Sequence, residues 1–286
     1  MFKIVSLSGK AGSGKDTIAI SLQAAVPNVY RHGWFAASLK EAASVYYGWD
    51  GSKDQKGRRF LQLLGTDVGR LFDKDVWLAS FVWRYDLTPI YQFVNSESSL
   101  ASRIAVLARI MSNEERNESK LADFFMVTYL GWDGKKTDLY QDSRGALLAA
   151  VEEFNPCFLI SDDALEEIYL QAAETQLSQN IYYNNHRTIT TEMRPPESPP
   201  LPVLIVTDTR FENEIALVRA LGGLDAVVVR RAKTSGTIET ENQNHVSENA
   251  LSHHRFALTI KNEGSLADIH HVALGLHAFV RGRVTA

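Results

Sequence analysis

Residues 7–17, LSGKAGSGKDT, constrain this chain most, because they follow an apolar run, FKIVSL, and precede a helical run, IAISLQAAV. A strand that enters a glycine-rich turn and then a helix directs several backbone N–H groups and the helix N-terminus at one anion. The spacing Gly9-x4-Gly14-Lys15 matches the phosphate-loop pattern, in which glycines permit close backbone approach and the lysine reaches the β- and γ-phosphates of a nucleotide. We therefore predict a nucleotide-phosphate site here, against the alternative of a plain glycine-rich turn.

One position departs from this pattern. The residue after the lysine is normally Ser or Thr, which holds Mg²⁺, whereas here Asp16 follows Lys15 and Thr17 comes one residue later. The phosphate prediction is unaffected, but the arrangement of the metal stays open.

Composition excludes several classes of protein. The 286 residues are 45% hydrophobic, which is enough for a full core, and the net charge of −4 argues against coating long nucleic acid. Cys157 is the only cysteine, so neither an intrachain disulfide nor a thiolate metal cluster is expected. No run approaches the roughly 18 apolar residues of a membrane span, and the N-terminus lacks signal-peptide features. We expect a soluble, cytoplasmic protein without a membrane partner.

Strands and helices alternate at both ends of the chain. Predicted helices cover 15–26, start near Leu39 and near Glu212, and close the chain after Ser265 as N-cap. Predicted strands cover 3–8, 34–37, 203–208, 225–231 and 256–260. This pattern predicts an α/β fold, an open parallel five-stranded sheet with helices on both faces. Ligands bind such sheets at the C-terminal ends of strands, where residues 9–17, 208–210 and 230–231 would gather.

Residues 57–72 predict one helix with two separate faces. Phe60, Leu61, Leu64, Val68 and Leu71 recur at helical spacing and should face the core. Arg59, Gln62, Thr66 and Arg70 form one stripe on the opposite side if the helix continues through Gly65. The stripe is either a solvated face or a second anion site, since two arginines beside a phosphate site suit another phosphate.

Residues 86–200 are predicted to be a helical insertion within a single domain of residues 1–286. Ser99 and Asp162 are the expected N-caps, and prolines crowd its end at 195–202, which indicates an exposed linker. The insertion is a candidate lid, with Arg103, Arg109, Arg116 and Arg144 available to close over phosphate.

Several blocks agree with one family. SGKDT, the helix RRFLQLLGTDVGR with DKDVW after it, VTDTRFENE, and HVSENAL followed by a strand and NEGSLADI resemble the phage-type deoxynucleoside monophosphate kinases. The blocks cover most of residues 1–85 and 201–286, and the central insertion matches nothing comparable. The resemblance implies a P-loop kinase fold, ATP with Mg²⁺ as phosphoryl donor and a deoxynucleoside monophosphate as acceptor, in a host cytoplasm if the chain is of phage origin.

Phosphoryl transfer between two polyanions needs cations rather than a general base, because the acceptor phosphate is largely ionised at neutral pH. We expect Lys15, Arg70, Asp208 and Arg210 to be catalytic. Arg59, Gln62, Thr66, Arg70, Asp208 and Arg210 are expected to bind the acceptor. Gly9, Ala11, Gly12, Ser13, Gly14, Lys15, Asp16 and Thr17 are expected to bind ATP.

Mg²⁺ is assigned to Asp16, through water, and to Thr17. Asp208 would orient magnesium waters or the acceptor sugar, unless it and Arg210 are only a capped helix start and a surface arginine. His245, Ser247 and Glu248 are either local helix caps or nucleotide contacts.

Two other functions remain open: a P-loop kinase for another small acceptor, such as dephospho-coenzyme A, and a nucleotide-binding switch without transfer. The expected partners are ATP and a deoxynucleoside monophosphate, not long nucleic acid, with a homodimer as a further candidate.

Overall fold

The computed structural model describes residues 4–85, 87, 100–174, 202–230 and 250–282. The chain divides into two compact units, Met1–Phe35 with Arg194–Ala286, and Ala36–Met193. We call them the sheet unit and the helical unit and describe each by itself.

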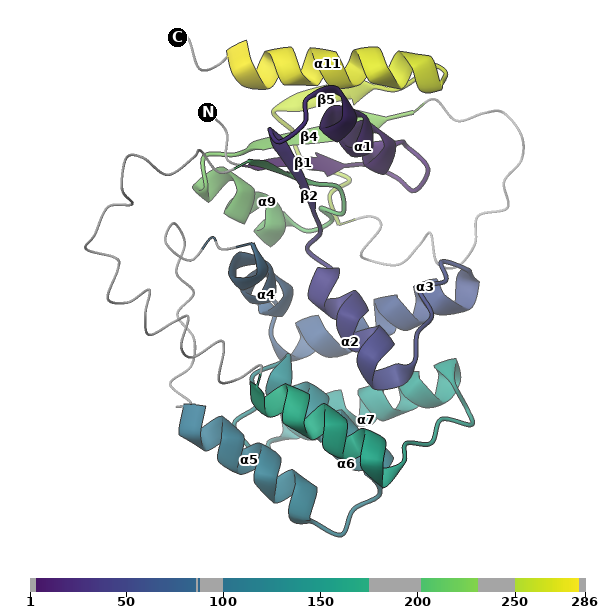
Figure 1. The fold of residues 1–286 in the computed structure, drawn as a ribbon, viewed down its shortest axis with the longest axis vertical. Coiled ribbons are helices and arrows are strands. Elements are labelled where there is room, and N and C mark those ends of the chain that lie inside the picture. Colours follow the sequence, from purple (N-terminus) through teal and green to yellow (C-terminus); the bar gives the residue numbers. More distant parts are fainter. Residues whose placement is uncertain (1–3, 86, 88–99, 175–201, 231–249, 283–286) are drawn as a thin grey trace, which may run out of the picture. The chain divides into compact units, whose positions relative to one another are not determined.

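The sheet unit contains five parallel strands (Figure 1). They are β1 (Ile4–Ser8), β2 (Tyr30–Gly33), β3 (Val203–Val206), β4 (Leu224–Val229) and β5 (Leu258–Lys261). Their order is β2-β3-β1-β4-β5, so β1 is central, with Val5 beside both Ile205 and Leu224. The predicted α/β fold with a five-stranded parallel sheet is confirmed, and the glycine-rich turn follows its central strand.

Helices cover both faces of this sheet. On one face, α1 (Lys15–Ala25) packs against α11 (Leu266–Gly282), and α9 (Glu212–Ala220) contacts β1 and β4 on the other (Figure 1). The core under α1 and α11 is closed by buried apolar side chains from alternate strand positions, such as Val5 and Leu7, and by Ile18. This burial on both faces explains why β3 is apolar throughout, while β1 carries two small buried polar residues, Ser6 and Ser8, among its apolar ones.

The second strand was predicted at the wrong place. Residues 34–37 are not a strand; β2 is Tyr30–Gly33, which pairs with β3 from Val203 to Val206, and α2 already begins at Ala37. Because β2 is an edge strand, only part of it is buried: Arg31 is exposed and His32 is half-buried. Its sequence, YRHG, therefore lacks the apolar run that marked the other strands.

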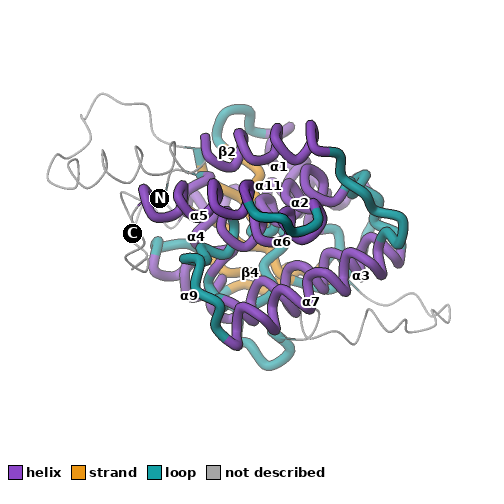
Figure 2. Tube along the Cα trace, turned by 90° about the horizontal axis from the view of Figure 1, so that it is seen from below, coloured by secondary structure: helices purple, strands orange, loops and turns teal. Residues whose placement is uncertain are grey.

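In the described part of the helical unit, every regular element is a helix (Figure 2). The elements are α2 (Ala37–Tyr47), α3 (Gln55–Gln62), η1 (Leu63–Arg70), α4 (Val76–Arg84), α5 (Leu100–Ser112), α6 (Asn117–Thr128), α7 (Asp138–Phe154) and a helix over 162–174. They share one core rich in aromatic side chains, among them Tyr47, Phe60 and Phe125. The helical unit thus begins at Ala36, well before the predicted insertion at residue 86.

The predicted single helix over 57–72 is wrong in its second half, because α3 passes into η1, a π-helix. A π-helix bonds residue i to i+5 rather than i+4, so the 3.6-residue periodicity fails beyond Gln62. Leu64 and Val68 are buried as predicted, but Leu71 is 54% exposed instead of facing the core. Leu61 is only partly buried.

Close packing accompanies the π-helix. The indole Nε1 of Trp77 donates to the carbonyl oxygen of Gly65 at 2.8 Å. A Cβ atom on Gly69 would lie 2.8 Å from Cζ2 of Trp77, and one on Gly65 would lie 2.6 Å from Cδ2 of Leu39. A Cβ on Gly69 would thus meet a rigid ring, whereas the one on Gly65 would meet the flexible end of a leucine, so the requirement for glycine is stronger at position 69.

One predicted helix N-cap is wrong by one residue, and several other predicted positions lie outside the residues that the structure describes. The helix over 162–174 is capped by Ser161, whose Oγ accepts from the backbone N of Ala164 at 3.2 Å, and not by Asp162. Ser265 precedes α11 as predicted, and its backbone N donates to the Asp268 carboxylate at 2.6 Å. Ser99, Arg231, 195–201 and 245–248 lie outside the described residues.

Candidate functional site

Glycines shape the turn between β1 and α1. Gly9, Gly12 and Gly14 have φ angles of 134°, 75° and 96°, values that L-residues with a Cβ rarely adopt. A Cβ on Gly9 would collide with the carbonyl oxygen of Val228, and one on Gly14 with the side-chain amide of Asn262. Residues 9–14, which we call the glycine loop, therefore need glycine at positions 9 and 14 for both conformation and space, and at position 12 for conformation alone.

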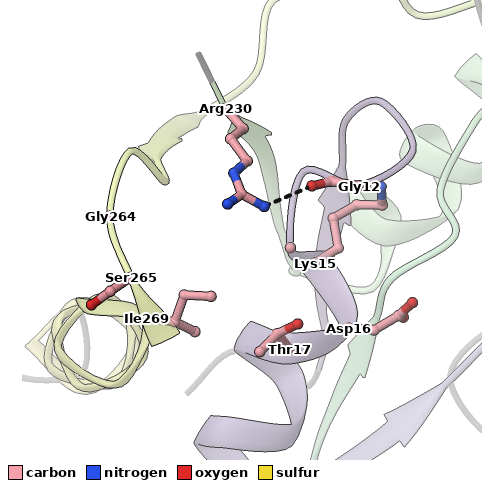
Figure 3. Close-up of a pocket in the computed structure, with 9 residues that line it drawn as sticks. Gly12, Lys15, Asp16, Thr17, Arg230, Gly264, Ser265 and Ile269 are labelled. Carbon is pink, nitrogen blue, oxygen red and sulfur yellow. Dashed lines mark hydrogen bonds between the residues drawn. The ribbon is translucent and has the colours of Figure 1, made fainter. Parts of the chain in front are cut away.

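A cavity of about 290 Å³ lies beside this loop, at the N-terminal end of α1 (Figure 3). It is lined by Gly12, Gly14, Lys15, Asp16, Thr17, Arg230, Gly264, Ser265 and Ile269. Arg230, at the end of β4, reaches toward the loop and its Nη1 donates to the Gly12 carbonyl oxygen at 3.4 Å. The expected gathering of the glycine loop and Arg230 at one edge of the sheet is confirmed.

The Lys15 side chain folds back, so that its ammonium group lies over the glycine loop. Its Nζ donates to the carbonyl oxygens of Gly9 at 2.6 Å and Lys10 at 3.0 Å, and it lies 3.4 Å from Ser13 Oγ. The ammonium group is thus held where the loop curves, next to the first turn of α1. Helix N-termini attract anions, so the helix and the lysine favour negative charge at the same place.

Asp16 is tied to the end of β3. Its Oδ1 accepts a hydrogen bond from the hydroxyl of Thr207, and it points away from the α11 side of the cavity (Figure 3). His32 Nε2 lies 2.9 Å from Thr207 Oγ1 and 3.7 Å from Asp16 Oδ1. The side chain of Asp16 stays 58% exposed. Sequence reasoning missed Thr207 and His32, because only the parallel pairing of β2 with β3 brings them beside α1.

Two residues at the start of α1, Asp16 and Thr17, have side-chain oxygen atoms of the kind that bind Mg²⁺. Asp16 and Thr17 offer a carboxylate and a hydroxyl at the cavity wall, the hard oxygen ligands that Mg²⁺ prefers. The described residues contain no group of three or more His, Cys, Asp or Glu side chains that could form a cage made only of protein ligands. Mg²⁺ typically binds with one or two carboxylates, substrate phosphates and water, and Asp16 contributes a carboxylate to the lining of this cavity.

Asp208 and Arg210 follow β3 but do not line the cavity. Asp208 Oδ1 accepts from the backbone N of Phe35 at 2.8 Å. The backbone N of Arg210 donates to Glu214 Oε2 at 2.7 Å, and the Arg210 side chain is exposed. Glu214 thus caps the start of α9. This agrees with the alternative interpretation, in which Asp208 and Arg210 are only a capped helix start and a surface arginine.

Of the predicted acceptor residues, the four of the stripe belong to the helical unit, whereas Asp208 and Arg210 belong to the sheet unit. Arg59 Nη1 lies 3.9 Å from Asp67 Oδ2, and Arg70 Nη1 donates to the carbonyl oxygen of Lys74 at 3.0 Å. Gln62 ends α3, whereas Thr66 lies in η1, so the stripe crosses from an α-helix into a π-helix. All four side chains are half-buried.

Arg144, one of the arginines suggested for the lid, serves an internal ion pair. Its Nε donates to Asp123 Oδ1 at 2.7 Å and its Nη2 to Glu115 Oε2 at 2.6 Å, which leaves the side chain 18% exposed. Tyr140 also donates to Asp123, yet burial raises the pKa of this carboxyl above its ordinary value. Arg144 is therefore held in the core of its unit.

Comparison with known proteins adds no relative. No protein-family model matches the chain, and a search of curated proteins found no match. The resemblance to deoxynucleoside monophosphate kinases therefore stays a prediction. Across the part of the chain that the structure describes, no helix is both long and apolar enough to span a membrane.

Proposed function

We propose that this chain is an ATP-dependent deoxynucleoside monophosphate kinase, which produces a deoxynucleoside diphosphate and ADP. The observation that carries the proposal is the glycine loop between the central strand β1 and α1, with Lys15 folded over it and a cavity beside it. The choice of acceptor rests on the sequence resemblance.

The donor would bind with its phosphates at the N-terminal end of α1. The positive φ angles of Gly9, Gly12 and Gly14 let the backbone approach an anion closely, and Lys15 and Arg230 supply two cations at the cavity. A Cβ at Gly9 or Gly14 would collide with the Val228 carbonyl or the Asn262 side chain and displace the loop. Mg²⁺, held by Asp16 and Thr17 with phosphate oxygens and water, would neutralise charge on the transferring group.

In the proposed reaction, a 5′-phosphate oxygen of the acceptor attacks the γ-phosphorus of ATP. A new P–O bond forms, the bond to the β–γ bridging oxygen breaks, and ADP leaves with that oxygen. The acceptor phosphate is largely dianionic at neutral pH, so no residue has to remove a proton. The protein has to position two polyanions and offset their charge, for which Lys15 is the principal donor-side cation.

In the helical unit, the stripe Arg59, Gln62, Thr66 and Arg70 is proposed to bind the acceptor phosphate. In the sheet unit, Asp208 and Arg210 are proposed as acceptor-binding residues by their place after β3. A phosphate suits the planar fork of arginine, which can form two parallel hydrogen bonds. Asp208 would accept from a sugar hydroxyl or from water at Mg²⁺.

A coupled assay of ADP release tests this function over a panel of deoxynucleoside and ribonucleoside monophosphates, with dephospho-coenzyme A included. We expect ADP release that depends on a deoxynucleoside monophosphate. Release that depends only on dephospho-coenzyme A would point to the other kinase. Tight ATP binding without any acceptor-dependent release would instead indicate a nucleotide-binding switch.

A further inference from the structure

Asn262 links the end of β5 to the glycine loop. It directly follows β5, and its backbone N donates to the carbonyl oxygen of Val229 at 2.8 Å, which extends the pairing with β4 by one step. Its side-chain Nδ2 donates to the carbonyl oxygen of Ser13 at 2.7 Å. Asn262 is 1% exposed, so this hydrogen bond is shielded from water. A residue 249 positions away in sequence thus holds the backbone of the loop.

This hydrogen bond fixes the orientation of one peptide group. In a trans peptide, the C=O and N–H groups point in opposite directions. Because the Ser13 carbonyl faces Asn262, the N–H of Gly14 in the same peptide faces away from Asn262. Gly14 itself lines the cavity at the start of α1. The Asn262 amide therefore fixes the direction in which the Gly14 N–H group points, at a residue that lines the cavity.

The neighbouring contacts come from the same edge of the sheet. The Val228 carbonyl of β4 presses against Gly9, and Arg230, one residue beyond β4, donates to the Gly12 carbonyl oxygen. Asn262 is the contact among these that is both buried and directional. Rotation of the Ser13–Gly14 peptide would break it, whereas the glycines by themselves have no side chain to resist that rotation.

We propose that Asn262 is a positioning residue for phosphate binding, which holds the Ser13–Gly14 peptide so that the Gly14 N–H faces a nucleotide phosphate. This inference rests on the phosphate site of the proposed function. It assigns to Asn262 part of the work of holding the glycine loop in its phosphate-binding conformation before the nucleotide arrives. Asn262 does not line the cavity, and it acts through the loop backbone.

A packing role alone does not explain this asparagine. Its Oδ1 is buried and finds no hydrogen-bond partner among the described residues. Burial of an unsatisfied acceptor destabilises a fold, so an apolar residue of similar size would serve packing better. The hydrogen bond to Ser13 is what a leucine at this position would lose.

The substitutions Asn262→Leu and Asn262→Asp separate the two roles. Leucine keeps the volume but cannot donate to the Ser13 carbonyl, and an ionised carboxylate repels that carbonyl. The probes are tripolyphosphate and ATP, each titrated calorimetrically into the full chain. Asn28→Asp, at an exposed position between α1 and β2, is the matched control for added charge.

We expect Asn262→Leu to stay folded, because the loss of the buried Oδ1 offsets part of the cost of the unpaired Ser13 carbonyl, and to weaken binding of both probes by about threefold to tenfold, the loss for one hydrogen bond. Asn262→Asp is expected to bind more weakly still at neutral pH. Its affinity should recover as the pH falls, because a protonated carboxyl can donate to the Ser13 carbonyl again. Asn28→Asp should bind both probes as the wild type does.

A folded Asn262→Leu that binds tripolyphosphate as tightly as the wild type would overturn the inference. If the leucine variant did not fold, wild-type affinity of a folded Asn262→Asp at neutral pH would overturn it equally. A wild-type chain that bound neither probe would overturn the proposed function together with this inference. If the variants bound the probes more weakly but the wild type showed no acceptor-dependent turnover, the positioning role of Asn262 would stand and the proposed kinase function would be rejected.

Discussion

Lys15 contributes charge to the glycine loop and little to the core. Its Nζ contacts two loop carbonyls and the cavity, while the buried positions of α1 are Ile18, Ala19 and Leu22. We expect Lys15→Ala to lower kcat by roughly a hundredfold or more, the usual loss when one transition-state cation is removed. Steady-state kinetics and thermal unfolding measure the two effects, and the melting temperature should not change.

Lys10→Ala is the matched control for Lys15→Ala, because Lys10 is exposed in the same loop and contributes its backbone carbonyl to the contact. It should retain most activity. Near wild-type turnover of Lys15→Ala would remove the glycine loop from the mechanism.

Arg70 tests the acceptor site. If it binds the acceptor phosphate, Arg70→Ala should lower kcat/KM for the acceptor by roughly ten- to a hundredfold, with little change in ATP affinity. Arg70→Lys should rescue only part of this loss, since an ammonium group lacks the planar fork. Arg58→Ala is the control, because Arg58 is an exposed arginine of α3 outside the stripe.

Equal losses for ATP and acceptor would assign Arg70 to the donor side instead. No kinetic loss would assign Arg70 a structural role, to which its hydrogen bond to the Lys74 carbonyl contributes.

At the scale of elements, the π-helix η1 depends on its glycines. A Cβ on Gly69 would press into the Trp77 ring, whereas one on Gly145, in α7, would meet no atom within 4 Å. Gly69→Ala should therefore destabilise the chain by about 1 to 3 kcal/mol, the usual effect of overpacking. Gly145→Ala should stabilise it by up to about 1 kcal/mol through helix propensity. Denaturant unfolding of both variants checks this, and equal effects would contradict it.

A second element-scale prediction concerns the contact of α9 with β4. The Arg219 guanidinium donates twice to the buried Asp225 carboxylate, at 3.1 Å and 2.9 Å. Burial raises the pKa of Asp225, but the hydrogen bonds from Arg219 and from the Ala257 backbone outweigh it and lower the pKa below its ordinary value. The ionised form is therefore favoured in the folded state.

A carboxyl with a lowered pKa stabilises the fold above its unfolded pKa of about 4, and this contribution is lost as the pH falls through the folded pKa. At neutral pH, Asp225→Asn should lower the free energy of unfolding by roughly 1 to 2 kcal/mol, allowing for the half-exposed arginine. The difference in the free energy of unfolding between the wild type and Asp225→Asn should become smaller below about pH 4. A gap that stayed constant with pH would refute the account of this pair.

The sequence predicted elements where burial and periodicity agree. β1 and β3 lie between neighbouring strands and are buried on both faces, so their largely apolar runs are visible in the sequence. β2 was misplaced because an edge strand needs apolar residues on one face only. In 57–72 the pattern assumed 3.6 residues per turn, and the π-helical turn set by Trp77, Gly65 and Gly69 depends on tertiary contacts that no local pattern reveals.

The residues of the candidate site likewise divide into those that the sequence predicted and those that it did not. Its loop was predictable because the glycines, Lys15 and Asp16 are contiguous in sequence. Thr207, His32 and Asn262 were not, since each comes from a different strand end and joins the loop only through the strand order of the sheet. The NEG triplet after β5 was the one local signal for Asn262.

At the scale of the whole molecule, the chain forms two compact units, whereas the sequence suggested one domain with a later insertion. The helices α2 to α4 share a core with α6 and α7, through residues such as Tyr47, Phe60 and Phe125. An amphipathic helix has the same sequence pattern whether its apolar face covers a sheet or another helix. For this reason the boundary at Ala36 could not be predicted from periodicity.

Transfer of the labelled γ-phosphoryl group of ATP to a deoxynucleoside monophosphate tests the central claim most directly. The full chain is incubated with γ-labelled ATP, Mg²⁺ and one acceptor at a time, and the products are separated. We predict that the label appears in the deoxynucleoside diphosphate, in equal amount to the ADP formed, and that Lys15→Ala abolishes this transfer. Label found only in inorganic phosphate, or left entirely in ATP with every acceptor, would contradict the proposed function.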